Sequence, residues 1–208
     1  MSFLKKDTIC AIATAAGTSA ISIIRMSGDD SHKIATRSFT RKNNKLTISD
    51  IKSNRMYYGE FVDNEGRTID DVMITFFKAP HSYTGEDSVE ISCHGSVFIQ
   101  NKILEILIQG GARLAEAGEY TMRAFINGKM DLTQAEAVAD IISSKNEAEH
   151  RVAMNQLKGG FSNQLKILRR NILDLTSLME LELDFSEEDV EFADRTKLNN
   201  IVDEASAH

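Results

Sequence analysis

Three charged side chains stand where the surrounding sequence makes a charge unusual, and each is a candidate for ligand binding. Arg25 ends an apolar, strand-like run over residues 20–26, where a guanidinium either reaches water at the sheet edge or holds an anion or a carbonyl oxygen. Glu90 lies inside a second such run, so its carboxylate either faces solvent or accepts hydrogen bonds from a ligand. Lys129 lies on a connection between two expected helices, where its ammonium group is exposed.

The cysteines give little support for covalent catalysis. Cys93 and His94 are adjacent, and neighbouring residues of a strand point to opposite faces, so these side chains are not expected to form a nucleophile–base pair. Cys10 and Cys93 both lie in apolar runs, which favours buried free thiols over a disulfide or a metal pair. We find no other activated nucleophile or acid–base pair, so the sequence favours binding over chemistry.

The composition is that of a globular protein without a broad nucleic-acid-coating surface. The 208 residues are 42% hydrophobic and 26% charged, with a formal net charge of −7. This acidic balance argues against a wide phosphate-binding surface but leaves a local basic patch open. No apolar run approaches the roughly 20 residues of a transmembrane helix, and the first residues show no signal-peptide core. We therefore expect a cytoplasmic protein.

Sequence motifs for several common cofactor sites are absent. The chain contains no GxxxxGK(S/T) loop, no GxGxxG after a strand, no CxxC and no HExxH. A P-loop nucleotide site is therefore excluded within these residues.

Apolar periodicity predicts a mixed α/β arrangement in the first half of the chain. Alternation with a period of two predicts strands at residues 8–13, 20–26, 55–62, 68–77, 88–93 and 112–115. Helices are expected from Asp29 or Asp30 to about residue 39, and over residues 97–109. Residues 40–54 are polar and basic, so we interpret them as a solvated loop, with a nucleic-acid patch as the alternative.

Helix signals midway along the chain mark a change to an all-α second half. One helix opens at Gly118 and ends at Gly128, because glycine accepts the left-handed conformation that follows a helix. Residues 133–136 (TQAE) fit a capping box that starts another helix. These signals predict an α+β fold, with a mixed α/β domain at residues 1–118 and an all-α helical domain at residues 119–208.

The second half is expected to be helical. Residues 135–142 form one amphipathic helix, and residues 146–183 form one long helix with a kink or frayed segment at Gly159 and Gly160. Beyond the kink, a 4-3-4-3-4 spacing of apolar residues indicates a helix-bundle face that needs a partner: Phe161, Leu165, Leu168, Ile172, Leu175 and Met179. Residues 184–194 are interpreted as an acidic connection rather than a Ca²⁺ loop, and residues 195–207 as a further helix.

Three motifs follow one another between residues 21 and 140. They are ISIIRMSG at 21–28, SYTGEDSVE with HG at 82–90 and 94–95, and GEYT, RAF, NGK, DL and QAEA from residue 118 onward. Together they resemble the MnmE (TrmE) family of GTPases, which modify the wobble uridine of certain tRNAs. One departure is Ala117, where that family usually has a proline; this loosens the helix entry.

The resemblance implies an architecture larger than these 208 residues. In that family an N-terminal α/β domain binds a folate one-carbon donor and forms a homodimer, and a G domain is inserted in the helical domain. The chain resembles the first domain and the first half of the helical domain. GTP hydrolysis, with its Mg²⁺ and K⁺, is then expected of the G domain outside this sequence. The expected partners are tRNA and the flavin-containing protein MnmG, and no membrane.

The family's folate contacts carry over onto Arg25, Glu90 and Lys129, and no catalytic or metal-ligating residue carries over. The implied cofactor is 5-formyltetrahydrofolate or 5,10-methylenetetrahydrofolate. A pterin presents an edge of N–H donors that suits Glu90, while the ligand's oxygens and glutamate tail suit the two cations. Two alternatives are a folate-dependent aminomethyl transferase without GTPase, and a ligand-free helical scaffold in which the three residues lie far apart.

Overall fold

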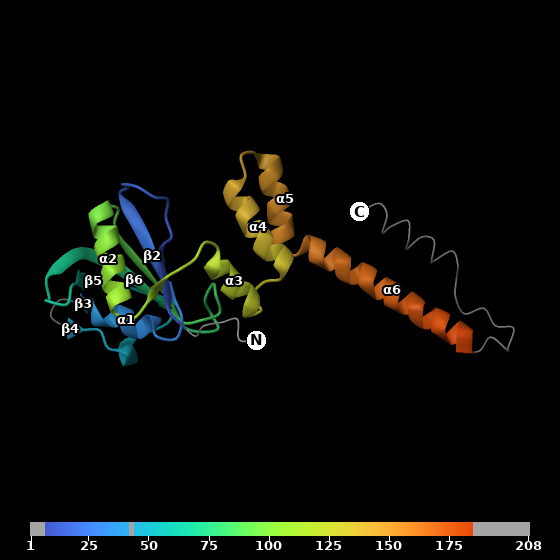
Figure 1. The fold of residues 1–208 in the computed structure, drawn as a ribbon, viewed down its shortest axis with the longest axis horizontal. Helices are drawn as coiled ribbons and strands as arrows, with labels where there is room; N and C mark the ends of the chain where they lie inside the picture. The colour runs from blue at the N-terminus through green and yellow to red at the C-terminus, as the bar shows by residue number, and fades with distance from the viewer. Residues whose placement is uncertain (1–6, 42–43, 185–208) are drawn as a thin grey trace. The chain divides into compact units, whose positions relative to one another are not determined.

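The chain forms two compact units of different fold class. The computed structural model describes residues 7–41 and 44–184, and the chain divides into Met1–Met130 and Asp131–His208. Figure 1 shows a sheet with flanking helices in the first unit and helices in the second. The predicted order, a mixed α/β part followed by a helical part, is confirmed. In the described part of the chain, no helix is long and apolar enough to cross a membrane.

One mixed sheet organises the first unit. Within the described ranges it has eight strands in the order β4-β3-β5-β6-β7-β2-β1-β8, and neighbours are antiparallel except for β1 and β8. The strands are β1 (Ile9–Ile12), β2 (Ile21–Ser27), β3 (Phe39–Arg41), β4 (Asn44–Lys45), β5 (Arg55–Val62), β6 (Thr68–Phe77), β7 (Ser88–His94) and β8 (Arg113–Leu114). The predicted bounds of β5 and β6 are confirmed, because their period-two pattern matches a strand with one buried face.

The segment predicted to be a loop, residues 40–54, contains regular structure. The last two residues of β3, the whole of β4 and a short 3₁₀ helix, η1 (Ile48–Asp50), lie there. Phe39, which we expected at the end of a helix, is fully buried and pairs with Phe61 of β5. The loop prediction was wrong because burial of a large aromatic ring stabilises a short strand whatever the polarity of the residues that follow.

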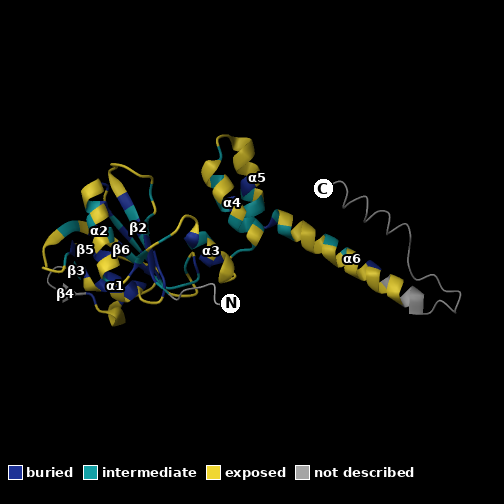
Figure 2. Ribbon diagram, viewed as in Figure 1, coloured by how far each residue is buried: buried dark blue, intermediate teal, exposed yellow. Residues whose placement is uncertain are grey.

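Helices α1 (Ser31–Arg37) and α2 (Val97–Gln109) pack on one face of the sheet, and Figure 2 shows the buried residues between these layers. Ile34 of α1 and Ile103 and Leu107 of α2 belong to this core. They meet buried strand residues that include Ile24, Met26, Ile74, Phe76, Val89 and Ile91. Because side chains alternate along a strand, Arg25 and Glu90 lie on the face opposite this core.

Gly28, which follows β2 in the first motif, is expected to resist substitution. It has a φ of 130°, and a Cβ atom there would lie 2.7 Å from the Cα atom of Thr8. Gly28→Ala is therefore expected to lower the free energy of unfolding by about 2–4 kcal/mol, through left-handed strain and overpacking together. Urea unfolding measures this loss.

Gly66 provides the matched control for that substitution. Its φ is also positive, at 80°, but a Cβ atom there would meet nothing within 4 Å. Gly66→Ala should therefore cost only the backbone strain, about 1–2 kcal/mol. Equal losses in the two variants would show that the close approach to Thr8 is unimportant.

Helix α3 (Glu119–Ile126) belongs to the first unit, so the domain boundary lies at Met130 rather than at the predicted residue 118. Its residues Glu119 and Arg123 are 5% and 3% exposed. Both form ion pairs with residues of the first unit, Asp7 among them. The prediction placed α3 with the helices that follow because helical periodicity does not say which core a helix joins.

The second unit begins with a capped helix, α4 (Leu132–Ser143). Asp131 is the N-cap: its Oδ1 atom accepts the N–H of Gln134 at 2.9 Å, and the Gln134 side chain accepts the N–H of Asp131. The capping box therefore starts at Asp131, two residues before the predicted Thr133. Sequence alone favoured the Thr133 pattern, although an aspartate is an equally good cap.

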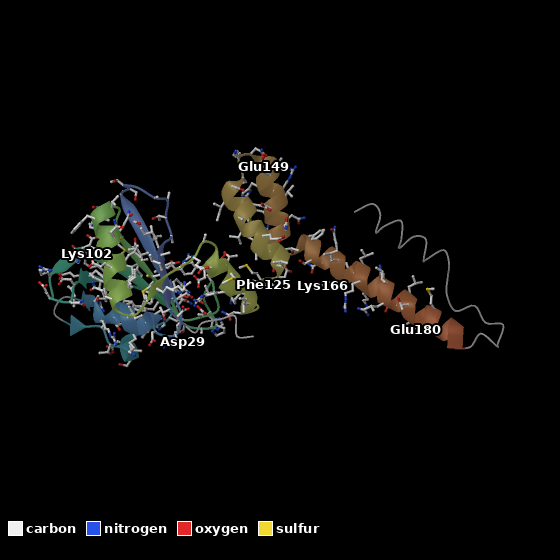
Figure 3. All side chains as sticks on the ribbon, viewed as in Figure 1. Asp29, Lys102, Phe125, Glu149, Lys166 and Glu180 are labelled. Carbon is white, nitrogen blue, oxygen red and sulfur yellow. The ribbon has the colours of Figure 1, made fainter. Side chains whose placement is uncertain are left out.

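Two helices replace the single long helix predicted over residues 146–183. They are α5 (Glu147–Leu157) and α6 (Gly160–Asp184). The break lies at Gly159, which has a φ of 80°, as the predicted interruption at the glycine pair indicated. Lys166 and Glu180, labelled in Figure 3, lie on α6. The predicted acidic connection after residue 184 and the helix at 195–207 fall outside the described residues.

The predicted apolar face of α6 is largely exposed. Phe161, Leu165, Ile172 and Met179 retain 44–46% of their accessible surface, while Leu175 is buried. We expect this face to drive concentration-dependent association, because exposed apolar area favours burial against another surface. Gel filtration over a range of concentrations should show it.

Matched double variants test whether α6 causes that association. Leu165→Gln with Ile172→Gln should reduce the concentration dependence, whereas Lys166→Gln with Arg170→Gln, on the same helix, should preserve it. A wild-type elution volume that is constant at every concentration would contradict the prediction.

Candidate binding site around Arg25 and Glu90

Arg25 and Glu90 meet as an ion pair on neighbouring strands. They face each other in the register of β2 and β7, and Arg25 Nη2 and Nε donate to Glu90 Oε1 at 2.7 and 3.0 Å. Their side chains are 30% and 32% exposed. In the described part of the chain, no protein hydrogen bond reaches Glu90 Oε2. The pair is thus accessible, with one carboxylate oxygen held and the other available.

Two tyrosine rings flank the Arg25 guanidinium. Its Cζ atom lies 5.4 Å from the ring centre of Tyr83 and 5.7 Å from that of Tyr120. The Tyr120 hydroxyl donates to the Arg25 carbonyl oxygen at 2.7 Å. Burial raises the pKa of the Tyr120 hydroxyl well above its usual range, so it remains a donor at neutral pH. The rings fix the guanidinium through cation–π contacts.

These tyrosines come from two of the motifs but were not predicted as site residues. Tyr83 lies on the loop between β6 and β7, and Tyr120 lies on α3. The Tyr83 hydroxyl also lies 2.9 Å from Thr121 Oγ1, which connects the loop to the helix. The sequence did show an aromatic residue within each of these two charged motifs. That signal does not reveal which strand the two rings contact.

Lys129 joins this region through the same loop. Its Nζ atom donates to the Pro80 carbonyl oxygen at 2.9 Å. A Cβ atom on Gly85 would lie 3.3 Å from Lys129 Cγ, so the lysine stem runs along the loop. Among the described residues, no hydrogen bond or ion pair joins Lys129 to Arg25 or Glu90. The structure thus brings two of the three predicted residues into contact and links the third to them through a shared loop.

An ion-pair network around the buried residues Arg123 and Glu119 anchors α3. Arg123 contacts Asp7, Glu86 and Glu119, and Arg113 contacts Asp7 and Glu119. Burial would raise the pKa of Glu119, but hydrogen bonds from Arg113, from the Glu116 N–H and from Arg123 outweigh it and lower the pKa to about 2. Figure 3 shows how densely side chains gather between α3, where Phe125 is labelled, and the sheet. This network was not predicted from the sequence, although Glu119 and Arg123 have the i, i+4 spacing of a helical ion pair.

The cysteines and His94 form no reactive pair in the structure. Cys10 and Cys93 are free and buried, and burial raises the pKa of each thiol to about 11. His94 points to the exposed side, with Nδ1 at 2.7 Å from Asp70 Oδ1. The prediction that Cys93 and His94 do not pair is confirmed. Among residues 7–41 and 44–184, no group of three His, Cys, Asp or Glu side chains could hold a metal ion.

Comparison with known families gives consistent matches along the chain. Residues 8–129 match the family model described as the GTP-binding protein TrmE N-terminus, and residues 132–208 match the MnmE helical domain. A tRNA modification GTPase MnmE from Flavobacterium johnsoniae is 52% identical over 199 residues, which are 96% of this chain and 42% of that protein.

Further curated relatives with the same name give similar values. The one from Parabacteroides distasonis is 54% identical over 198 residues, covering 95% of this chain and 43% of the relative. The one from Bacteroides fragilis is 53% identical over 201 residues, covering 97% and 43%. The chain therefore spans less than half the length of these relatives.

Proposed function

The chain belongs to the MnmE (TrmE) family of tRNA modification GTPases, and from this premise we propose that it binds the reduced folate that donates carbon for wobble-uridine modification. The proposed ligand is 5-formyltetrahydrofolate or 5,10-methylenetetrahydrofolate. Matches to both family models favour this function over a folate-dependent aminomethyl transferase without GTPase.

The observation that carries the proposal is the accessible Arg25–Glu90 pair. Arg25 holds Glu90 Oε1 at 2.7 Å, which keeps the carboxylate oriented, while Oε2 is available to a ligand's N–H groups. A pterin edge supplies such donors. Tyr83 and Tyr120 add aromatic surface beside the pair. A negatively charged glutamate tail suits Lys129, which lies exposed on the neighbouring turn.

The residues of this site suit binding rather than chemical catalysis. Arg25, Glu90 and Lys129 supply charges and hydrogen bonds, and both cysteine thiols have a pKa of about 11. We propose that the whole protein hydrolyses GTP, with Mg²⁺ and K⁺, in a G domain that these 208 residues do not contain. Modification of the tRNA wobble uridine would then require that G domain and the flavin-containing partner MnmG, and we propose that it takes place in the cytoplasm.

We further propose that the first unit forms a homodimer. The sheet face that carries Arg25 also exposes Met56, Tyr58 and Met73, which retain 60%, 56% and 47% of their surface. Apolar side chains gathered on one sheet face favour contact with another protein surface. We propose a second copy of this chain as that partner, because the family resemblance implies a homodimer formed by this domain.

Isothermal titration with 5-formyltetrahydrofolate tests the ligand assignment directly. Saturable heat at a stoichiometry of about one per chain is expected, with folic acid as the oxidised comparison ligand. An absence of binding under conditions where the protein is folded would overturn the proposed function.

A further inference from the structure

The loop between β6 and β7, residues 78–87, connects the parts of the proposed folate site. Its Tyr83 ring flanks Arg25, and its Pro80 carbonyl accepts the hydrogen bond from Lys129. The Thr84 carbonyl accepts a further hydrogen bond from Asn127 Nδ2 at 2.7 Å. The position of this loop therefore sets where Tyr83 stands relative to the Arg25–Glu90 pair.

Glu86 ties this loop to a buried arginine on α3. Arg123 is 3% exposed, and its Nη1 atom donates to Glu86 Oε1 and Oε2 at 3.3 and 3.2 Å. The Ser27 hydroxyl donates to Glu86 Oε2 at 2.7 Å. Glu86 thus joins the loop both to the helix and to the end of β2, the strand that carries Arg25.

The contact with Glu86 is the longest of Arg123's ion pairs. Arg123 Nη2 lies 2.7 Å from Asp7 Oδ1 and 2.9 Å from Glu119 Oε1. The pair with Asp7 joins α3 to the start of the described chain, and the pair with Glu119 lies within α3. Of these three ion pairs, only the one with Glu86 reaches the loop. The buried Arg123 Nε has no hydrogen-bond partner in the described part of the chain, so the guanidinium is aimed by its two terminal nitrogens.

We infer that Arg123 and Glu86 are positioning residues for the folate site, holding Tyr83 beside Arg25 without contacting the ligand themselves. The inference rests on the proposed function. A charge-assisted hydrogen bond such as Arg123–Glu86 constrains geometry more strongly than a neutral one such as Asn127–Thr84. A small displacement of a positioning loop is enough to weaken binding, because the ligand contacts depend on preorganised geometry.

Glu86→Gln is the variant of choice, because Arg123 is buried among several carboxylates and its replacement would risk unfolding. Glutamine keeps the size of the side chain and removes the charge. Ile103→Val is the control, since Ile103 is fully buried in the core on α2 and its truncation lowers stability without touching the loop.

The first measurement needs no ligand. The Arg25 Nε–H signal in a ¹H–¹⁵N spectrum reports the flanking Tyr83 ring, and Tyr83→Ser defines the signal without that ring. We expect Glu86→Gln to move the Arg25 signal toward its Tyr83→Ser position and Ile103→Val to leave it unchanged. An unchanged signal in Glu86→Gln would overturn the inference.

The second measurement is the affinity for 5-formyltetrahydrofolate. Glu86→Gln should raise Kd at least tenfold, while Ile103→Val should bind within twofold of wild type. If the wild type binds and Glu86→Gln binds with the same Kd, the positioning role is overturned while the proposed function stands. If wild type itself fails to bind, the proposed function fails, and the Arg25 signal alone decides whether Glu86 positions Tyr83.

Discussion

Replacing Glu90 with alanine is expected to raise the Kd for 5-formyltetrahydrofolate by about 100-fold or more. A hydrogen bond to a charged group contributes about 1.5–3 kcal/mol, and 1.4 kcal/mol corresponds to a factor of ten in affinity. A pterin edge that donates to this carboxylate through two N–H groups would lose both bonds at once. Isothermal titration of the wild type and the variant measures the difference.

Loss of binding in this variant should not reflect loss of folding. The Arg25–Glu90 pair is about one-third exposed, with side chains at 30% and 32%, so solvent screens it. Such a pair contributes about 1 kcal/mol or less to the free energy of unfolding. Glu105→Ala, which removes one exposed carboxylate from α2, is the matched control and should retain wild-type Kd. Equal affinity in Glu90→Ala and Glu105→Ala would rule out Glu90 as a ligand contact.

Combining Glu90→Ala with Arg25→Ala tests whether the two residues act on the ligand as a unit. Each single variant removes a ligand contact and also the partner that orients the other residue. The double variant should therefore lose less affinity than the sum of the two single losses. Strict additivity would indicate that the residues bind separate parts of the ligand, or that one of them does not bind it.

The sequence predicted the sheet well where a single strand carries its own signal. Residues 55–62 and 68–77 alternate apolar and polar side chains, and the structure has β5 and β6 with these bounds. Strands β3 and β4 carry no such signal because they are two or three residues long. They form because β3 pairs with the edge of β5 and β4 then pairs with β3, and these partners lie outside either strand's own sequence.

The candidate site was predictable to the extent that its charges interrupt apolar runs. Arg25 and Glu90 stood out for that reason, and the antiparallel register of β2 and β7 brings them together. Tyr83 and Tyr120 did not stand out, because an aromatic residue in a loop or a helix has many possible neighbours. Their role depends on how the loop at residues 78–87 and α3 meet the sheet.

The misplaced domain boundary has the same physical origin as the missed network. The sequence pattern of α3 is helical, like that of the helices after it. Two buried charges, Glu119 and Arg123, decide that α3 packs with the first unit. A buried arginine–glutamate pair on one helix needs further partners, because isolated buried charges are costly. Those partners lie 116 residues away at Asp7 and 37 residues away at Glu86. No local window of sequence contains them.

Glu119→Gln is expected to destabilise the first unit by about 3 kcal/mol at pH 7, because it removes one of the two carboxylates that Arg113 and the buried Arg123 share and leaves Asp7 as the other. Glu119 is 5% exposed and accepts 2.7 and 2.9 Å hydrogen bonds from those two residues. Glu116→Gln is the matched control, three residues earlier and exposed, and should cost little. Urea unfolding of both variants measures the difference in the free energy of unfolding.

The same carboxylate should make the protein sensitive to acid in a defined range. The fold lowers the pKa of Glu119 from the usual 4.5 to about 2, so the unfolded chain binds a proton at a higher pH than the folded chain does. The stabilisation is therefore complete above about pH 4.5 and is lost as the pH falls toward about 2. Its full size is on the order of 3 kcal/mol, since one pKa unit corresponds to about 1.4 kcal/mol.

Unfolding measured at several pH values separates Glu119 from the other carboxylates. Asp7 also has a lowered pKa, from hydrogen bonds with Arg113 and Arg123 that outweigh its desolvation, so the wild type and Glu116→Gln should both lose stability below pH 4.5. Glu119→Gln starts lower at pH 7 and should lose less on acidification, because the titrating group is gone. The curves of Glu119→Gln and Glu116→Gln should thus converge as the pH falls. Parallel curves would show that Glu119 is not the acid-sensitive anchor of α3.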